Sequence, residues 1–226
     1  VVDKLKESGK GLKVAGHIVP LVPAAILFDL SNGGEKQWSK NPYPNLGKQA
    51  FKNLKPKFEL GSVGAGCGAQ GGTMKGGLGS ASFKLSNGIT VGALVAANPA
   101  GDATDETGRH FWAAPFEVGN EFGGFGAPSG GSYAKSFKRS ELFPLEDRAN
   151  TTIGIIATDA DLTKAQAQRL ATSAHDGIAR AIVPSHLPYD GDLIFASSTK
   201  KFPLREEVYD LAEICHAASL CMARAI

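Results

Sequence analysis

The chain has 226 residues, of which 42% are hydrophobic, and its 24 basic and 22 acidic side chains leave a net charge of +2. This size and apolar content are typical of one globular domain, and the near balance of charge argues against a disordered chain and against electrostatic nucleic-acid binding. Glycine is over-represented, because 28 of the 226 residues is about 12%, against about 7% in average proteins. Some part of the chain therefore needs unusual backbone freedom.

Cysteine and apolar patterning exclude further classes of protein. Three cysteines are an odd count for a disulfide framework, which favours a reducing, cytoplasmic location. No apolar run reaches the roughly 18 residues of a membrane-spanning helix, so we expect no membrane partner. No histidine has a partner at metal-ligand spacing, so neither a metal nor another cofactor is expected. The chain opens at Val1 in what reads as the tail of a helix, and we expect that sequence belonging before it is missing.

The first half of the chain is predicted to contain strands, a short helix and a hairpin. The apolar stretch 14–30, interrupted by two prolines, suits a strand followed by a loop, and a short helix is predicted over 45–54. Two strands are predicted within 81–97, on either side of Asn87-Gly88. Asn-Gly is a strong hairpin signal, because a type I′ turn needs positive φ at both central residues.

The second half begins with a stretch that has little apolar content. Residues 101–149 carry many glycines and mixed charges, which predicts a flexible linker. The linker leads directly into a predicted strand over 151–158, and a helix capped near Asp161 or Thr163 ends before Pro184.

A second buried strand and a C-terminal helix complete the chain. The strand is predicted over 193–196, and one face of the helix is marked by Val208, Leu211, Cys215, Ala218 and Met222. Hairpin-connected strands with helices packed alongside predict an α+β fold with antiparallel sheet.

Several familiar catalytic patterns fail in detail. The glycine-rich stretch 61–79 does not have the spacing of a dinucleotide fingerprint, and no helix pattern follows it. Serine, histidine and aspartate are all present, but no Gly-x-Ser-x-Gly elbow joins a strand to a helix. Cys67 has no visible histidine partner and is interpreted as a shielded thiol rather than a nucleophile.

The junction Asn150-Thr151-Thr152 is more informative. A threonine hydroxyl is a poor nucleophile without an adjacent base, and a threonine at a new chain start supplies that base as its own α-amino group. The reference pKa of such an amine, about 7.7 to 8.0, leaves a useful neutral fraction at pH 7. A flexible linker before a rigid strand suits self-cleavage at this point. From the pattern alone, an ordinary N-cap or loop Asn-Thr pair is the more frequent meaning.

Five motifs occur in order along nearly the whole chain. They are Val22-Pro23-Ala24-Ala25-Ile26-Leu27-Phe28-Asp29-Leu30, Gly64-Ala65-Gly66 with Lys75-Gly76-Gly77-Leu78-Gly79-Ser80-Ala81-Ser82, Val95-Ala96-Ala97-Asn98-Pro99, Asn150-Thr151-Thr152-Ile153 and Asp190-Gly191-Asp192. Together they resemble peptidase family S58, the P1 family of self-processing amidohydrolases. This family includes the L-aminopeptidase/D-esterase, the β-peptidyl aminopeptidases and the nylon-oligomer endohydrolase.

The resemblance implies an α+β fold in the form of a four-layer α/β/β/α sandwich of antiparallel sheets, with the N-terminal part of the family fold missing from this chain. A single catalytic domain would span 1–226. Cleavage between Asn150 and Thr151 would give a large portion, 1–150, and a small portion, 151–226. The resulting αβ heterodimers are expected to assemble further, as a tetramer.

The resemblance also implies roles for particular residues. Thr151 would be the nucleophile both for its own release and for the substrate. Asp190 and Asp192 match the pair that orients the nucleophile and its amine, and Asn98 matches the asparagine that donates a hydrogen bond to the oxyanion. Lys75 matches a lysine of the nylon-oligomer branch that assists proton transfer or stabilises charge.

Phe28 stands where several relatives have a tyrosine, so a phenolic hydrogen bond is missing, although Phe28 is expected to line the substrate pocket. Thr151, Lys75 and the two aspartates favour the nylon-oligomer branch. The expected activity is hydrolysis of linear amides, nylon-oligomer-like or peptide-like, with a small amide or short peptide as partner. The alternatives are an aminopeptidase or esterase that releases β- or D-type N-terminal residues, and an unprocessed binding or structural homologue.

Overall fold

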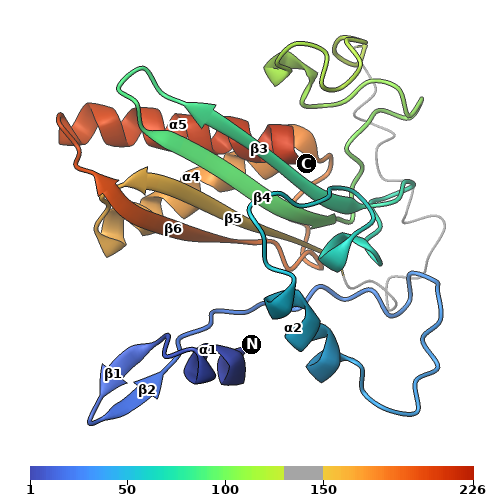
Figure 1. Ribbon diagram of the computed structural model, residues 1–226. Coiled ribbons are helices and arrows are strands. Elements are labelled where there is room, and N and C mark those ends of the chain that lie inside the picture. The colour runs from blue at the N-terminus through green and yellow to red at the C-terminus, as the bar shows by residue number, and fades with distance from the viewer. Residues whose placement is uncertain (130–149) are drawn as a thin grey trace. The chain divides into compact units, whose positions relative to one another are not determined.

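The computed structural model describes residues 1–129 and 150–226, and Figure 1 shows the arrangement of its elements. The chain forms two compact units. One unit contains residues 1–26 and 33–59, and the other contains 27–32 and 60–226. No residue between 1 and 59 is buried, so the first unit has no core of its own.

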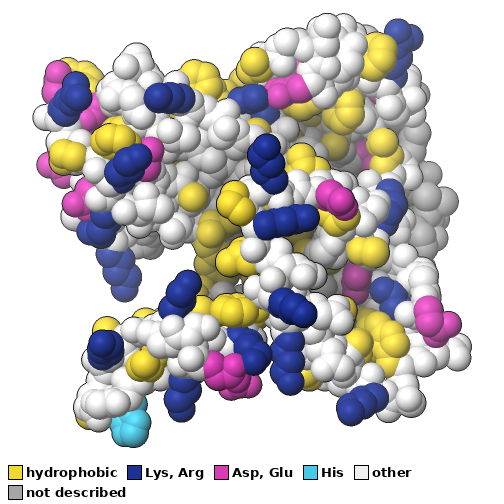
Figure 2. All heavy atoms as spheres, in the orientation of Figure 1, with side chains coloured by type: hydrophobic (Ala, Val, Ile, Leu, Met, Phe, Trp, Pro, Cys, Tyr) yellow, Lys and Arg dark blue, Asp and Glu magenta, His cyan; other side chains and the backbone are white. Residues whose placement is uncertain are grey.

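The first unit consists of short elements. Helix α1 (Val2–Glu7) precedes an antiparallel pair, β1 (Leu12–Val14) and β2 (His17–Val19), and α2 (Tyr43–Lys52) confirms the predicted short helix. The strand and loop predicted within 14–30 are found as β2 and the loop that follows it, and strand structure ends at Val19, before two prolines that have no N–H to donate. Lysine side chains project from α2 and from the N-terminal elements, where no residue is buried (Figure 2).

The second unit is built on a four-stranded sheet in the order β3 (Gly77–Lys84), β4 (Thr90–Asn98), β5 (Thr151–Ala160), β6 (Leu193–Phe202). The pairs β3/β4 and β4/β5 are antiparallel, whereas β5/β6 is parallel. The sheet is therefore mixed rather than purely antiparallel. The reason is that a helix connects β5 to β6 and returns the chain to the end of the sheet where β5 began.

The predicted hairpin is confirmed as β3 and β4, but its turn differs from the predicted type. The Leu85 amide donates to the Ile89 carbonyl (2.8 Å), so the loop has three residues. Gly88 has φ of +91°, and no positive φ is found at Asn87. A three-residue loop needs only one left-handed position, and glycine occupies it.

Helices α4 (Lys164–Ala181) and α5 (Glu207–Ala225) pack against the sheet and cover one of its faces (Figure 1). Thr163 and Gln166 form a reciprocal capping box, which confirms the predicted helix start at Thr163. The core between helices and sheet includes Val91, Val95, Ile156, Leu170, Ile178, Ile214 and Met222. The described part of this unit therefore has a helix layer and a sheet layer, which agrees with the α+β class.

The alternation along β5 shows how the sheet is oriented. Ile156 is fully buried against the helices, while its neighbour Ile155 is 37% exposed on the opposite face.

The prediction of which face of α5 is buried is only partly correct, because Val208 is 77% exposed. Val208, Leu211 and Cys215 instead line a groove of about 370 Å³ between α4 and α5.

Part of the expected linker 101–149 is well packed. Thr104 pairs with Phe111 in an isolated bridge, a 3₁₀ turn spans Ala114–Phe116, and Trp112 is only 7% exposed. Asp102 pairs with Val183, which ties the segment to the loop after α4. The sparse apolar residues are thus used for packing. The remainder, 130–149, lies outside the described residues.

No helix in the described parts of the chain is long and apolar enough to cross a membrane.

Candidate active site

Thr151 begins β5, one of the two central strands of the sheet. It is the first residue of β5, its side chain is buried, and its Cα partner on β4 is Asn98, the last residue of that strand. Asn150, one residue earlier, pairs in parallel with Asp190. Strand pairing thus brings Asn98, Thr151 and the Asp190-Gly191-Asp192 segment together, although they are separated by many residues in sequence.

The carbonyl oxygen of Asn150 receives two hydrogen bonds. Thr151 Oγ1 donates to it at 2.6 Å, and the backbone N–H of Gly191 donates to it at 2.8 Å. A side chain at position 191 would place its Cβ 2.9 Å from Thr151 Oγ1, so the close approach requires glycine. The bond between residues 150 and 151 therefore has a hydroxyl and an amide donor at the same oxygen.

The two aspartates hold different neighbours of Thr151. Asp192 Oδ1 accepts a hydrogen bond from the Thr152 amide (2.8 Å). Asp190 accepts from the Ala100 amide through Oδ1 and from the Leu187 amide through Oδ2, both at 3.1 Å. Burial raises the pKa of Asp190, and the nearby Asp192 carboxylate adds to the rise although the Leu187 amide opposes it.

Asn98 is fully buried and its amide joins three segments. Its Oδ1 accepts from Asn32 Nδ2 and from the Gln70 amide, both at 2.9 Å. Its Nδ2 donates to the Phe28 carbonyl at 3.1 Å. The segment around Phe28, the Gln70 loop and the end of β4 are therefore held next to the start of β5. No local sequence signal pointed to Asn32 as a partner of Asn98.

Lys75 and Phe28 lie at the edge of this arrangement. The Lys75 ammonium is exposed and donates to the Cys67 carbonyl at 2.6 Å, and Lys75 pairs with Gln70 across their loop. The Phe28 side chain is 36% exposed.

The prediction that the Cys67 thiol is shielded is wrong. Cys67 is exposed, because it follows a short 3₁₀ turn at the surface.

Two buried polar side chains flank Thr151. The amide of Asn150 and the hydroxyl of Thr152 have no hydrogen-bond partner among the residues that the structure describes. Buried polar groups are almost always paired, so these two side chains set the surroundings of Thr151 apart from the rest of the core. Within the same described residues, no three His, Cys, Asp or Glu side chains are placed to hold a metal ion.

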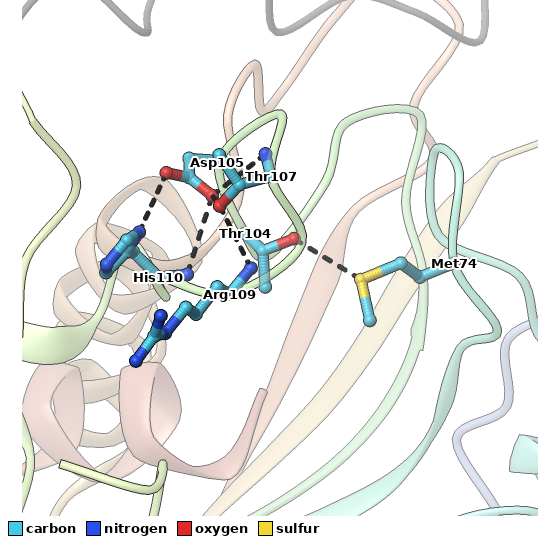
Figure 3. Close-up of polar contacts among 6 residues, drawn as sticks. All are labelled: Met74, Thr104, Asp105, Thr107, Arg109 and His110. Carbon is cyan, nitrogen blue, oxygen red and sulfur yellow. Dashed lines mark hydrogen bonds and ion pairs between the residues drawn. The ribbon is translucent and has the colours of Figure 1, made fainter. Parts of the chain in front are cut away.

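The loop after β4 is organised around Asp105 (Figure 3). The Asp105 carboxylate accepts hydrogen bonds from Thr107 Oγ1 (2.6 Å) and pairs with His110 Nδ1 (3.0 Å). Burial by itself raises the pKa of Asp105, but the hydrogen bonds from Thr107 and His110 outweigh it and lower the pKa to about 2. Thr104, next to it, donates to Met74 Sδ at 3.3 Å. This contact joins the loop to the segment that carries Lys75.

Comparison with known structures places the fold in a class. The structure of an L-aminopeptidase D-Ala-esterase/amidase from Ochrobactrum anthropi, described as a variant of the Ntn-hydrolase fold, superimposes with a TM-score of 0.55. The match covers 79% of this chain and 47% of that one at 24% identity, which shows the fold. The described sheet and helix layers are therefore of the Ntn-hydrolase type.

The chain matches the model of peptidase family S58 over residues 1–226 and belongs to that family. An uncharacterized aminopeptidase of Mycobacterium tuberculosis is 37% identical over all of this chain, which spans 67% of that protein. A 6-aminohexanoate-oligomer endohydrolase of Kocuria sp. is 29% identical over 81% of this chain and 51% of its own length. The chain thus spans between half and two thirds of the length of these relatives.

The Asp105 cluster predicts a pH-dependent contribution to stability. The pKa of Asp105 in the folded chain, about 2, lies below the unfolded reference of about 3.9. Its contribution is therefore fully present above about pH 4 and is lost as the pH falls toward 2. We expect Asp105→Asn to lower the free energy of unfolding near pH 6 and the difference from wild type to shrink in acid, as measured by urea denaturation.

The matched control is Asp161→Asn, which removes an exposed ion pair with Lys200 and should change stability by less than about 1 kcal/mol. A difference between wild type and Asp105→Asn that stayed constant from pH 6 to pH 2.5 would contradict the assigned hydrogen bonds.

Proposed function

We propose that this chain is an amidohydrolase that cleaves itself between Asn150 and Thr151 and then uses Thr151 to hydrolyse linear amides. The observation that carries the proposal is the pair of donors on the Asn150 carbonyl oxygen, Thr151 Oγ1 at 2.6 Å and the Gly191 amide at 2.8 Å. The nucleophile is adjacent to the carbonyl it would attack, and a fixed dipole points at the oxygen on which charge would develop.

Self-cleavage would proceed as an acyl shift. The Oγ1–C bond forms at the Asn150 carbonyl, the negative charge on oxygen is stabilised by the Gly191 N–H, and the C–N bond then breaks. The hydroxyl proton ends on the released nitrogen of Thr151. Water adds to the resulting ester and leaves the Asn150 carboxylate and a free Thr151 with its own amine, which then acts as the base.

The same group would turn over substrate. The Thr151 amine takes the hydroxyl proton, directly or through water, while Oγ1 attacks the substrate amide. The amine portion of the substrate leaves, and water hydrolyses the acyl-enzyme. We assign Asn98, held by three hydrogen bonds opposite Thr151, as donor to the oxyanion, and Asp190 and Asp192 as the groups that orient the Thr151 amine.

Two further residues have supporting roles in the proposal. Lys75 stabilises charge at the edge of the site from the loop that also contacts Asn98 through Gln70. Phe28, whose carbonyl is bonded to Asn98 and whose ring is half-exposed, lines the substrate pocket. An apolar ring at this place favours the methylene chain of a linear amide over a polar substituent.

The strand order supports a processed αβ heterodimer. After cleavage β5 and β6 would belong to the small piece, and β3 and β4 to the large piece. Eight residue pairs between β4 and β5 would hold the two pieces in one sheet. We further propose that these heterodimers associate as a tetramer. The three cysteines are free, which fits a reducing, cytoplasmic location.

The second candidate is release of N-terminal residues from short β- or D-configured peptides. It is favoured by one observation, that relatives named as aminopeptidases are 37% identical over the full chain, against 28–29% over 81% for the endohydrolases. Both candidates share the nucleophile and the acyl-enzyme, and they differ only in whether a free amine must lie next to the bond that is cleaved.

Replacement of the nucleophile is the first test. Thr151→Ala should abolish formation of the 150- and 76-residue pieces and lower amide hydrolysis by about 10³-fold or more, because no hydroxyl remains to attack. Thr151→Ser should still be cleaved. Intact mass and N-terminal sequencing of the small piece report both results.

The control is Thr158→Ala, which removes another buried threonine of β5 whose hydroxyl donates to the Thr90 carbonyl. It should cost stability and leave cleavage intact. Cleavage that persists in Thr151→Ala, or its loss in Thr158→Ala with the fold preserved, would count against the proposal.

The glycine between the aspartates gives a second test. Gly191→Ala places a methyl group 2.9 Å from Thr151 Oγ1 and displaces the hydroxyl from the Asn150 carbonyl. A displacement of this size should slow self-cleavage by about 10²-fold. Gly92→Ala is the matched control, because its added carbon lies 3.8 Å from the nearest atom, and its cleavage rate should equal that of wild type. Equal rates in all three proteins would show that the packed geometry has no role.

Substrate tests separate the two candidates. An N-acetylated 6-aminohexanoate trimer should be hydrolysed if the chain acts on internal amides, since Thr151 needs only the carbonyl. A free-amine β-dipeptide amide should be the better substrate if the amine is recognised. Product masses identify the bond that is cut, and hydrolysis of the free-amine substrate alone would favour the aminopeptidase.

A further inference from the structure

A histidine that the proposed mechanism does not use contacts one of the site aspartates. His186 Nδ1 lies 2.8 Å from Asp192 Oδ2. The other oxygen, Asp192 Oδ1, accepts from the Thr152 amide at 2.8 Å. The Asp192 side chain is only 4% exposed, so these two contacts account for both of its oxygens. One side chain therefore links His186 to the backbone adjacent to Thr151.

The chemistry of the two groups determines which one donates the hydrogen bond. A carboxylate oxygen accepts hydrogen bonds, so His186 donates its Nδ1–H to Asp192 Oδ2. The hydrogen bond from His186 to Oδ2 fixes the orientation of the Asp192 carboxylate, so that Oδ1 faces the Thr152 amide. A carboxylate that lost this partner would be free to rotate away from the Thr152 amide, because buried charged groups need all their hydrogen bonds.

The surroundings hold the His186 ring in place. The His175 ring, from α4, lies against it with 5.3 Å between the ring centroids. Burial lowers the pKa of His175, and the neighbouring His186 lowers it further, so a neutral ring packs against His186 without like-charge repulsion. The other charged groups near the two rings are Asp190 and Asp176.

The backbone of His186 has an unusual conformation. Its φ is +55°, in the left-handed region that non-glycine residues seldom adopt. Such conformations persist when surrounding contacts hold them, and they concentrate at functional sites. The ring is 37% exposed, so it connects the buried Asp192 to solvent.

We propose that His186 is a positioning residue for the Thr151 nucleophile and acts through Asp192. This inference rests on the proposed function, because it concerns the same reaction. His186 does not touch the reacting atoms. It fixes the Asp192 carboxylate, which in turn holds the Thr152 amide and keeps Thr151 Oγ1 at the Asn150 carbonyl.

Two substitutions at position 186 separate the effect of losing the ring from the effect of straining the backbone. His186→Gly removes the ring without straining the left-handed backbone, whereas His186→Asn keeps an N–H donor near the position of Nδ1 and also tolerates positive φ. The refolded precursor is followed by intact mass from pH 5 to pH 9. His186→Gly should form the two pieces about 10²-fold more slowly. His186→Asn should remain within about tenfold of wild type, since the donor is retained.

Chemical rescue distinguishes positioning from a general loss of stability. Added imidazole should restore part of the cleavage rate of His186→Gly, because it can occupy the space of the missing ring and donate to Asp192. His110→Gly, which breaks the similar His–Asp pair in the loop after β4, should lower stability, and imidazole should leave its cleavage rate unchanged.

The outcomes separate the two proposals. If wild type is not cleaved, or if Thr151→Ala is cleaved, the proposed function fails and the role of His186 fails with it. If wild type is cleaved and Thr151→Ala is not, a His186→Gly cleavage rate equal to that of wild type overturns the role of His186 alone. Far-ultraviolet circular dichroism verifies the fold of each variant. A folded His186→Asn that is as slow as His186→Gly also overturns it.

Discussion

The pairing of β5 on both of its edges is the constraint on which the rest of the structure depends. On one edge the antiparallel register with β4 aligns Thr151 with Asn98, and on the other the parallel register with β6 brings in the segment 190–192. A slip of one residue on either edge would move Thr151 to the opposite face of the sheet. The fully buried core beneath β5 prevents such a slip, because Ile156 must remain against the helices.

This constraint also fixes the position of the bond that precedes Thr151. Each residue from Thr151 to Thr158 is paired with a residue of β4, and Thr152 is held in addition by Asp192. Rigid placement on the C-terminal side keeps the hydroxyl at a fixed carbonyl, and the entropic cost of that placement is met by folding of the sheet. In the proposed reaction the broken bond lies at the edge of this rigid region, so the two pieces would remain paired.

Local patterns predicted the elements better than their arrangement. The hairpin, α2, the capping box of α4 and the strand from Thr151 follow from turn chemistry, capping residues and runs of apolar residues, all of which act over a few residues. The parallel pair β5/β6, the packed part of 101–129 and the exposed Val208 do not follow from such patterns. Each depends on which surface of an element meets another element, which periodicity leaves open.

The sequence by itself determined the secondary structure around the site, the family motifs and the choice of Thr151 with Asn98, Asp190 and Asp192 as candidate residues. Only the tertiary structure decided that the Gly191 amide reaches the Asn150 carbonyl, that Asn98 is tied to the Phe28 segment, and that His186 holds Asp192. The physical reason is that most of these contacts join residues about forty or more positions apart. Their meeting depends on strand register and loop path, which no local signal encodes. His186 lies six residues before Asp192, yet the contact between them forms only once the loop that joins them is folded.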